Sequence, residues 1–365
     1  MQHHRAVSTN LDRPLILGIE TSCDDTACAV IDGVGRVLSS AVSSQNIAHQ
    51  PFGGVVPEIA SREHLSNWPA VSAKALEDAS MAMHDVDAVA ATRGPGLIGS
   101  LLVGLSLGRS IAFGLERPFH GIHHLEGHLY SPFLSNDGGP AEEIPGHFVG
   151  LVVSGGHTSL LDVRAGRVKS LVETRDDAMG EVFDKVGKRL GLPFPQGPVV
   201  DRLAEKGTVS STLFRVPRVQ DELYFSYSGL KSQALREIES LTERGVVTEG
   251  APRGDGEGEL PGPALDLLAS FRWAAVRQII DRLRRVHDRM RIDTLAVSGG
   301  VAANRLLRKE LIRWAGEAAV NLRLVPLRFS GDNAAMIAFA ALVRQRQGMA
   351  EDPLSTVVAS RIPFR

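Results

Sequence analysis

The sequence predicts an α/β fold in which two related lobes face each other across a nucleotide-binding cleft. Three observations support this prediction. Each half opens with an apolar strand, a polar turn and a return strand, over residues 15–31 and 148–163. The Val-Ser-Gly-Gly sequence at 153–156 recurs at 297–300. A chain of 365 residues is also too long for one compact core, so we expect a duplicated lobe.

Composition limits the classes of function. The apolar fraction of 43% and charged fraction of 22% are ordinary for a globular protein. A formal charge of −2 gives no general attraction to nucleic acid or membrane, so such binding needs a local patch. Cys23 and Cys28 form neither a zinc motif nor a disulfide framework, which favours a reducing cytoplasm. Residues 1–14 lack an apolar core and are predicted to form a disordered tail.

Apolar runs and punctuating turns define the elements of the first half. The predicted strands are 15–20, 27–31, 36–43, 87–91 and 119–122. The turn at 21–26 carries hydroxyls and carboxylates that could face a phosphate or its cation, with a plain polar turn as the alternative. A helix is expected from about Pro57. The apolar run 97–115 contains Arg109, glycines and serines, which favours a buried helix over a membrane span.

His124 and His128 form the most distinctive pair in the chain. They are four residues apart, so a helix places both on one face, and neutral imidazole is a common ligand of zinc or iron. Glu126 lies about 200° round that helix, which argues against a zincin-type general base. A solvated or hydrogen-bonded histidine pair is the alternative. We choose Asp332 as the third ligand, although an aspartate at a helix start is ordinarily an N-cap.

The second half repeats the plan of the first. The predicted strands are 148–153, 159–163, 293–297 and 322–326, and the predicted helices are 176–190, 263–291, 305–314 and 334–345. The Ser-Gly-Gly turns after two of these strands are suited to contact a nucleotide. Asp184 and Asp201 flank a rigid loop at 193–198, where they could accept hydrogen bonds from ribose or be simple surface charges. Residues 243–262 are predicted to form a flexible loop.

Together these motifs resemble those of the TsaD family, the tRNA adenosine threonylcarbamoyltransferases once labelled O-sialoglycoprotein endopeptidases. The resemblance covers about residues 15–358, and the motifs that carry it are 18–26, 94–97, 124–128, 154–158, 298–304 and 332–333. It implies the ASKHA fold of actin, sugar kinases and Hsp70. In that fold the N-terminal lobe would span 15–123, completed by about 325–365. The C-terminal lobe would span 124–324, with a helical insertion and the loop 243–262.

The resemblance also implies an activity and a set of site residues. The reaction would transfer threonylcarbamoyl from threonylcarbamoyl-adenylate to N6 of adenosine 37 in tRNAs that read ANN codons, releasing AMP. His124, His128 and Asp332 would bind iron or zinc, and Asp24 would act in turnover. The implied substrate contacts are Val152, Val153, Ser154, Gly155, Gly156, Asp184, Gly197, Asp201 and Asn304. One departure from the family pattern is Gln196, where a glycine is expected.

The resemblance implies partners as well. They are tRNA, a TsaB-like inactive paralogue, a TsaE-like ATPase and a TsaC-type enzyme that supplies the adenylate. The cleft would hold this adenylate, ATP or AMP, in the cytoplasm and without membrane association. Two alternatives belong to other classes: a glycoprotein metallopeptidase, and a non-catalytic actin-like scaffold that binds nucleotide.

Overall fold

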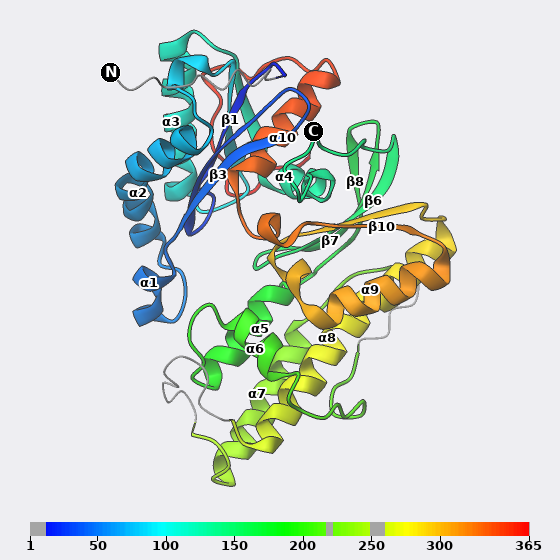
Figure 1. Cartoon of the computed structure of the whole chain (residues 1–365). Helices are drawn as coiled ribbons and strands as arrows, with labels where there is room; N and C mark the ends of the chain where they lie inside the picture. The colour runs from blue at the N-terminus through cyan, green and yellow to red at the C-terminus, as the bar shows by residue number, and fades with distance from the viewer. Residues whose placement is uncertain (1–11, 217–221, 249–259, 365) are drawn as a thin grey trace.

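The computed structural model describes residues 12–216, 222–248 and 260–364, and two five-stranded mixed sheets form its framework (Figure 1). The N-terminal sheet has the order β3-β2-β1-β4-β5, and the C-terminal sheet has the order β10-β9-β6-β7-β8. In each sheet, three consecutive strands pair antiparallel and two further strands are added in parallel. The predicted α/β fold of two related lobes is therefore confirmed.

The strands agree closely with the apolar runs of the sequence. Their bounds are β1 Ile16–Glu20, β2 Asp25–Ile31, β3 Val37–Ser44, β4 Ala88–Gly94, β5 Phe119–His123, β6 His147–Val153, β7 Thr158–Arg164, β8 Arg167–Glu173, β9 Thr294–Ser298 and β10 Asn321–Leu324. Every residue of β1, β5 and β9 is buried, as expected of sheets covered on both faces.

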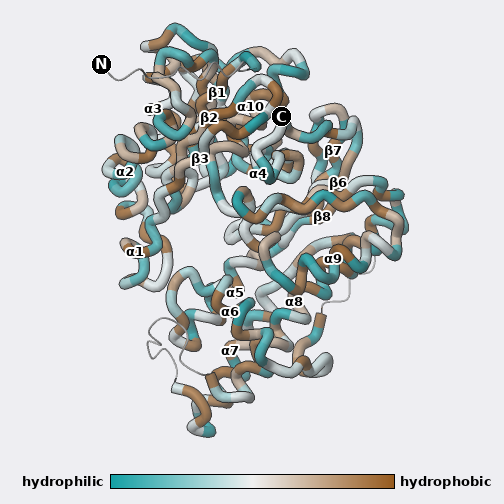
Figure 2. The backbone as a smooth tube through the Cα atoms, in the orientation of Figure 1, coloured by the Kyte–Doolittle hydropathy of each residue, from teal (hydrophilic) through white to brown (hydrophobic). Residues whose placement is uncertain are grey.

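The helices cover these sheets. Their bounds are α1 Asn46–His49, α2 Pro57–Asp78, α3 Ile98–Leu115, α4 His124–Tyr130, α5 Met179–Arg189, α6 Gln196–Leu203, α7 Ser228–Glu243, α8 Gly262–Arg289, α9 Arg305–Ala318 and α10 Ala334–Arg346. Helices α2 and α3 lie on one side of the N-terminal sheet and α10 lies on the other (Figure 1). Helices α5 to α8 form the insertion between β8 and β9. Figure 2 shows that the N-terminal strands and α10 are among the most hydrophobic parts of the chain.

Helix α10 packs directly on the first strand because Gly18 has no side chain. A Cβ at Gly18 would lie 2.2 Å from the carbonyl oxygen of Ala334, so only glycine permits this approach. Helix α4 contacts β5, β6, β9 and α10, and so lies between the two sheets. This packing connects the start of α10 to α4.

Helix α3 is the one helix of the described residues that is long and apolar enough to cross a membrane. It packs against α2 and β4 with Leu101, Leu105 and Ala112 buried, but only 33% of it is buried and Phe113 is exposed, so the predicted buried helix is only partly right. The predicted strand ending at 91 is longer in the structure, because β4 continues to Gly94. The prediction of a loop over 193–198 is partly wrong, since helix α6 begins at Gln196. Pro198 is tolerated in the first turn of α6 because the backbone N–H groups there need no partner within the helix.

Parts of two predicted flexible segments fall outside the described residues, namely 1–11 of the tail and 249–259 of the loop. Within the described part of the tail, the carbonyl oxygen of Asp12 accepts a hydrogen bond from the backbone N–H of Gly33. Within the other segment, residues up to Glu243 belong to α7, and α8 begins at Gly262.

Candidate metal centre

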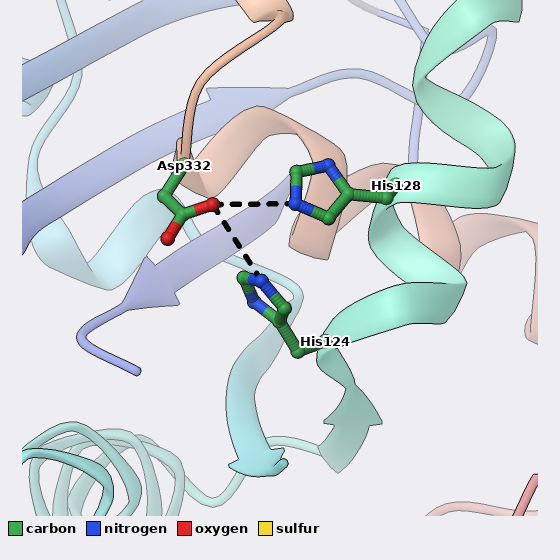
Figure 3. Close-up of side chains that lie close together, drawn as sticks. All are labelled: His124, His128 and Asp332. Carbon is green, nitrogen blue, oxygen red and sulfur yellow. Dashed lines mark ion pairs between the residues drawn. The ribbon is translucent and has the colours of Figure 1, made fainter. Parts of the chain in front are cut away.

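Two histidines of one helix and an aspartate from a distant part of the sequence converge between the two sheets. Oδ1 of Asp332 lies 3.2 Å from Nε2 of His128 and 3.5 Å from Nε2 of His124 (Figure 3). All three offer one ligand atom, and these atoms lie within 4.8 Å of one another. Two imidazoles and one carboxylate are a donor set that suits zinc or non-haem iron and leaves coordination positions open.

The histidines are positioned by a short helix that begins where β5 ends. The side chain of His123 caps α4 by accepting a hydrogen bond from the backbone N–H of Leu125. His124 and His128 are then one turn apart, with ring centroids 4.7 Å apart. Gly127 lies against α10, where a Cβ would come within 2.9 Å of Ile337. The absence of a side chain at Gly127 therefore allows α10 to pack closely against α4.

Asp332 is free to face the histidines because its neighbour caps the helix. Oδ1 of Asn333 accepts a hydrogen bond from the backbone N–H of Met336, which is the N-cap interaction of α10. The ordinary capping role considered for Asp332 is thus filled by Asn333. The carboxylate of Asp332 points toward α4 in Figure 3.

The nitrogen atoms of His128 fit a metal better than they fit a plain core histidine. The side chain is fully buried, yet neither ring nitrogen makes a hydrogen bond of acceptable geometry within the described residues. Burial also lowers the pKa of His128, which favours the neutral imidazole that a metal requires. A buried nitrogen without a hydrogen bond is costly, and a cation bound at Nε2, the nitrogen that faces Asp332, would satisfy that atom.

His124 has partners on both of its ring nitrogens. Its Nδ1 lies 3.2 Å from Oε2 of Glu20 and 3.2 Å from Oγ of Ser22, while its Nε2 faces Asp332. Burial alone would lower the pKa of His124, but the charges of Asp332 and Glu20 raise it to about 9. Burial would likewise raise the pKa values of Asp332 and Glu20, but the neighbouring histidines hold both below their usual range.

Glu126 takes no part in this cluster. Its carboxylate makes two contacts with the guanidinium of Arg344 on α10. This ion pair agrees with the prediction, made from helix geometry, that Glu126 points away from the histidines. A general base of the zincin type is therefore missing at this position.

The predicted substrate loop follows β6, which contains Val152 and Val153. Ser154 is buried and its hydroxyl accepts a hydrogen bond from the backbone N–H of His157, while Gly155 and Gly156 are exposed. Apart from the glycine and its two chain neighbours, no atom of the described residues lies within 4 Å of the position that a Cβ would occupy at either glycine. The loop therefore presents open backbone beside the start of α5.

The second Ser-Gly-Gly turn lies directly against this loop. Gly299 has φ +93°, and a Cβ there would lie 2.3 Å from the carbonyl oxygen of Val153. The two similar turns of the sequence are thus adjacent, at the ends of the parallel strands β6 and β9.

The remaining predicted substrate contacts form two hydrogen-bonded groups. Asp184 on α5 accepts a hydrogen bond of 2.8 Å from the backbone N–H of Gly197 on α6. Asp201 accepts one of 2.7 Å from Nδ2 of Asn304, and its two oxygens also accept from Arg272 and from the backbone N–H of Arg305. In this structure Asp201 therefore orients Asn304. Gln196, the departure from the family pattern, is buried and fits against Gly187, where a Cβ would lie 2.6 Å away.

The acidic turn after β1 lies close to the centre. Burial raises the pKa of Asp24, and the charge of Asp332 raises it further. Burial, with Asp332 and Asp24, raises the pKa of Asp25 to about 7. Asp25 belongs to the turn 21–26, which the sequence predicts could face a phosphate or its cation, whereas Glu20 and His157 were missed as neighbours of the centre. Burial, together with the nearby charges of His124 and His128, lowers the pKa of His157 to about 4. The buried carboxylate that ends β1 was the one available signal.

Comparisons with known proteins agree with these features. The family model of TsaD, tRNA N6-adenosine threonylcarbamoyltransferase, matches residues 36–339. Relatives with that name are 41% identical in Picosynechococcus (96% of this chain, 95% of the relative) and 43% identical in Pelobacter propionicus (95% and 96%). Among solved structures, HypF of T. kodakarensis superposes with a TM-score of 0.58 at 14% identity, over 94% of this chain and 49% of that one. This last similarity concerns the fold alone.

Proposed function

The chain belongs to the TsaD family of tRNA N6-adenosine threonylcarbamoyltransferases, and we propose how its residues carry out that reaction. The threonylcarbamoyl group would move from threonylcarbamoyl-adenylate to N6 of adenosine 37 in tRNAs that read ANN codons. The N6–carbon bond forms, the bond from carbon to the phosphate oxygen breaks, and AMP leaves with the electron pair. The observation that carries this assignment is the cluster of His124, His128 and Asp332 in a chain of this family.

The three clustered side chains are proposed as ligands of one divalent metal, iron or zinc. The short distances among their donor atoms support this role, as does Nε2 of buried His128, which faces Asp332 and makes no hydrogen bond of acceptable geometry among the described residues. When bound, the metal would supply Lewis-acid polarisation of the transferred carbonyl group. Ser22 and Glu20 hold the other side of His124.

The glycine loops and nearby carboxylates are proposed to bind the adenylate. Residues 152–156 would face its phosphate, because the open backbone at Gly155 and Gly156 lets an anion approach closely. Asp184, Gly197, Asp201 and Asn304 would contact ribose and base. Asp24 would accept the proton released from N6, since a carboxylate with a raised pKa is a better general base at neutral pH. Most of the rate would come from positioning the two substrates.

The partners and location are proposed on the same basis. Transfer to tRNA in repeated turnovers would require a TsaB-like paralogue and a TsaE-like ATPase, with the adenylate supplied by a TsaC-type enzyme. The two free cysteines, Cys23 and Cys28, suit the reducing cytoplasm in which tRNA is modified.

The test is transfer of labelled threonylcarbamoyl-adenylate to unmodified tRNA, with the partner proteins present. The wild type is compared with the variant His124→Ala/His128→Ala. We expect transfer by the wild type alone. Absence of transfer with either protein would favour the non-catalytic scaffold, and equal transfer by both would remove the metal centre from the reaction.

A further inference from the structure

Glu20 lies behind His124, on the side of the imidazole ring away from Asp332. Oε2 of Glu20 is 3.2 Å from Nδ1 of His124, and the glutamate is fully buried. Asp332 faces the opposite nitrogen, Nε2. Each nitrogen of the ring therefore faces a different carboxylate, buried Glu20 at Nδ1 and partly exposed Asp332 at Nε2.

The fold holds Glu20 in place from two further sides. The hydroxyl of Thr92 donates a hydrogen bond to Oε2, and the backbone N–H of Ser22 donates one to Oε1. Strands β1 and β4 pair in parallel up to Ile19 and Ala91, so Glu20 and Thr92 follow side by side. Strand β5 is the next strand of the sheet and leads directly into His124.

A buried carboxylate next to one nitrogen of a metal-binding histidine has a defined chemical effect. It accepts the N–H of that nitrogen, which fixes the tautomer and leaves the other nitrogen as a lone-pair donor. It also restrains the orientation of the ring and increases the basicity of the ligand. Ser22 Oγ, 3.2 Å from the same Nδ1, is a second polar neighbour of that nitrogen.

We propose that Glu20 is a positioning residue that holds His124 as its Nδ1–H tautomer and directs Nε2 toward the metal. Thr92 supports this role by donating to the same carboxylate oxygen that faces His124. The inference rests on the metal centre proposed above. The ligands of the centre come from α4 and from Asp332, and Glu20 adds to them a supporting carboxylate from β1, the first strand of the N-terminal lobe.

The experiment measures zinc affinity of the full chain by competition with a chromophoric chelator. The variant Glu20→Gln keeps the size of the side chain but removes its charge. Its zinc affinity is expected to fall by roughly 10- to 100-fold, the loss typical when a hydrogen-bond partner of a metal-bound histidine is replaced. The control is Glu126→Gln, which removes a carboxylate from the opposite face of α4. Glu126 pairs with Arg344 and contacts neither histidine, so the zinc affinity of this variant should stay within about twofold of the wild type.

A second readout separates positioning from a general loss of structure. Nitrogen NMR of His124 should show protonated Nδ1 and unprotonated Nε2 in the zinc-bound wild type, and a weakened preference in Glu20→Gln. Thr92→Val, which only removes the donor to Glu20, should lower zinc affinity in the same direction by a smaller factor. This variant keeps the test valid if Glu20→Gln does not fold.

The outcomes are distinguishable. A wild type that binds no zinc would remove the metal centre and the role of Glu20 with it. If the wild type binds zinc and Glu20→Gln binds it with unchanged affinity, only the inference about Glu20 is overturned. If Glu20→Gln is unfolded, unchanged zinc affinity in Thr92→Val has the same meaning.

Discussion

Glu126 and Arg344 form a buried ion pair, with Oε2 of Glu126 2.5 Å from Nη2 of Arg344, on the face of α4 opposite His124 and His128. The pair ties α4 to α10, the helix that follows Asp332. The glutamate of the motif therefore stabilises the scaffold of the centre instead of acting beside it. A metallopeptidase would need a general base where this chain has none, which is why the transferase is preferred.

Replacing Glu126 with Ala is expected to lower the free energy of unfolding by about 3 kcal/mol, because it leaves the charge of buried Arg344 with a weaker set of partners. Urea denaturation monitored by circular dichroism measures the loss. Metal content of the folded variant should equal that of the wild type. Loss of metal at unchanged stability would contradict this assignment.

Replacing His128 with Ala is expected to abolish metal binding, because it removes a buried ligand whose nitrogens have no other hydrogen-bond partner among the described residues. In the wild type, zinc at 100 times its dissociation constant should stabilise the fold by about 2.7 kcal/mol, and in the variant this gain should vanish. Thermal unfolding with and without zinc provides the measurement. His147→Ala is the control, since His147 at the start of β6 pairs with Asp162 on β7, outside the cluster, and should keep the zinc response.

Replacing Gly299 with Ala is expected to disturb both Ser-Gly-Gly turns. The residue has φ +93° and ψ 161°, a region nearly restricted to glycine, where another residue costs about 1–3 kcal/mol. Its Cβ would also press on the carbonyl oxygen of Val153. AMP affinity should fall more than zinc affinity, which isothermal titration of each ligand can determine. Gly316→Ala is the control, because Gly316 lies on α9 outside both turns and a Cβ there meets no atom of the described residues within 4 Å beyond its own helix.

The carboxyl of Asp184 should make stability depend on pH. Burial raises its pKa from 3.8 to about 6 despite the N–H of Gly197, so the folded state holds the proton more tightly than the unfolded state. The favourable contribution of protonated Asp184 to the free energy of unfolding is complete below about pH 4 and is lost as pH rises through about 6. Asp184→Asn should thus gain stability relative to the wild type between these values, by about 1–3 kcal/mol after allowing for partial solvent screening.

Urea unfolding at several pH values between 4 and 7 tests this difference in metal-free protein. The asparagine retains a carbonyl oxygen that can accept the hydrogen bond from Gly197, so the comparison isolates the charge. Parallel pH profiles for the two proteins would refute the raised pKa.

Local periodicity was enough to predict the strands, most helices and the pairing of His124 with His128. An interval of four residues brings two side chains onto one helical face whatever the rest of the chain does. The choice of Asp332 as the third ligand has no such local basis, because an aspartate at that place is ordinarily an N-cap; the resemblance to TsaD implies the same residue.

The residues that surround the centre could be identified only from the packing of the folded chain. Glu20 and His124 are 104 positions apart, and their contact depends on the sheet order β1-β4-β5, which apolar periodicity does not encode. The same holds for Asn333, whose capping bond leaves Asp332 to the histidines. Contacts of this kind arise from how helices and strands pack, and packing is a property of the whole chain.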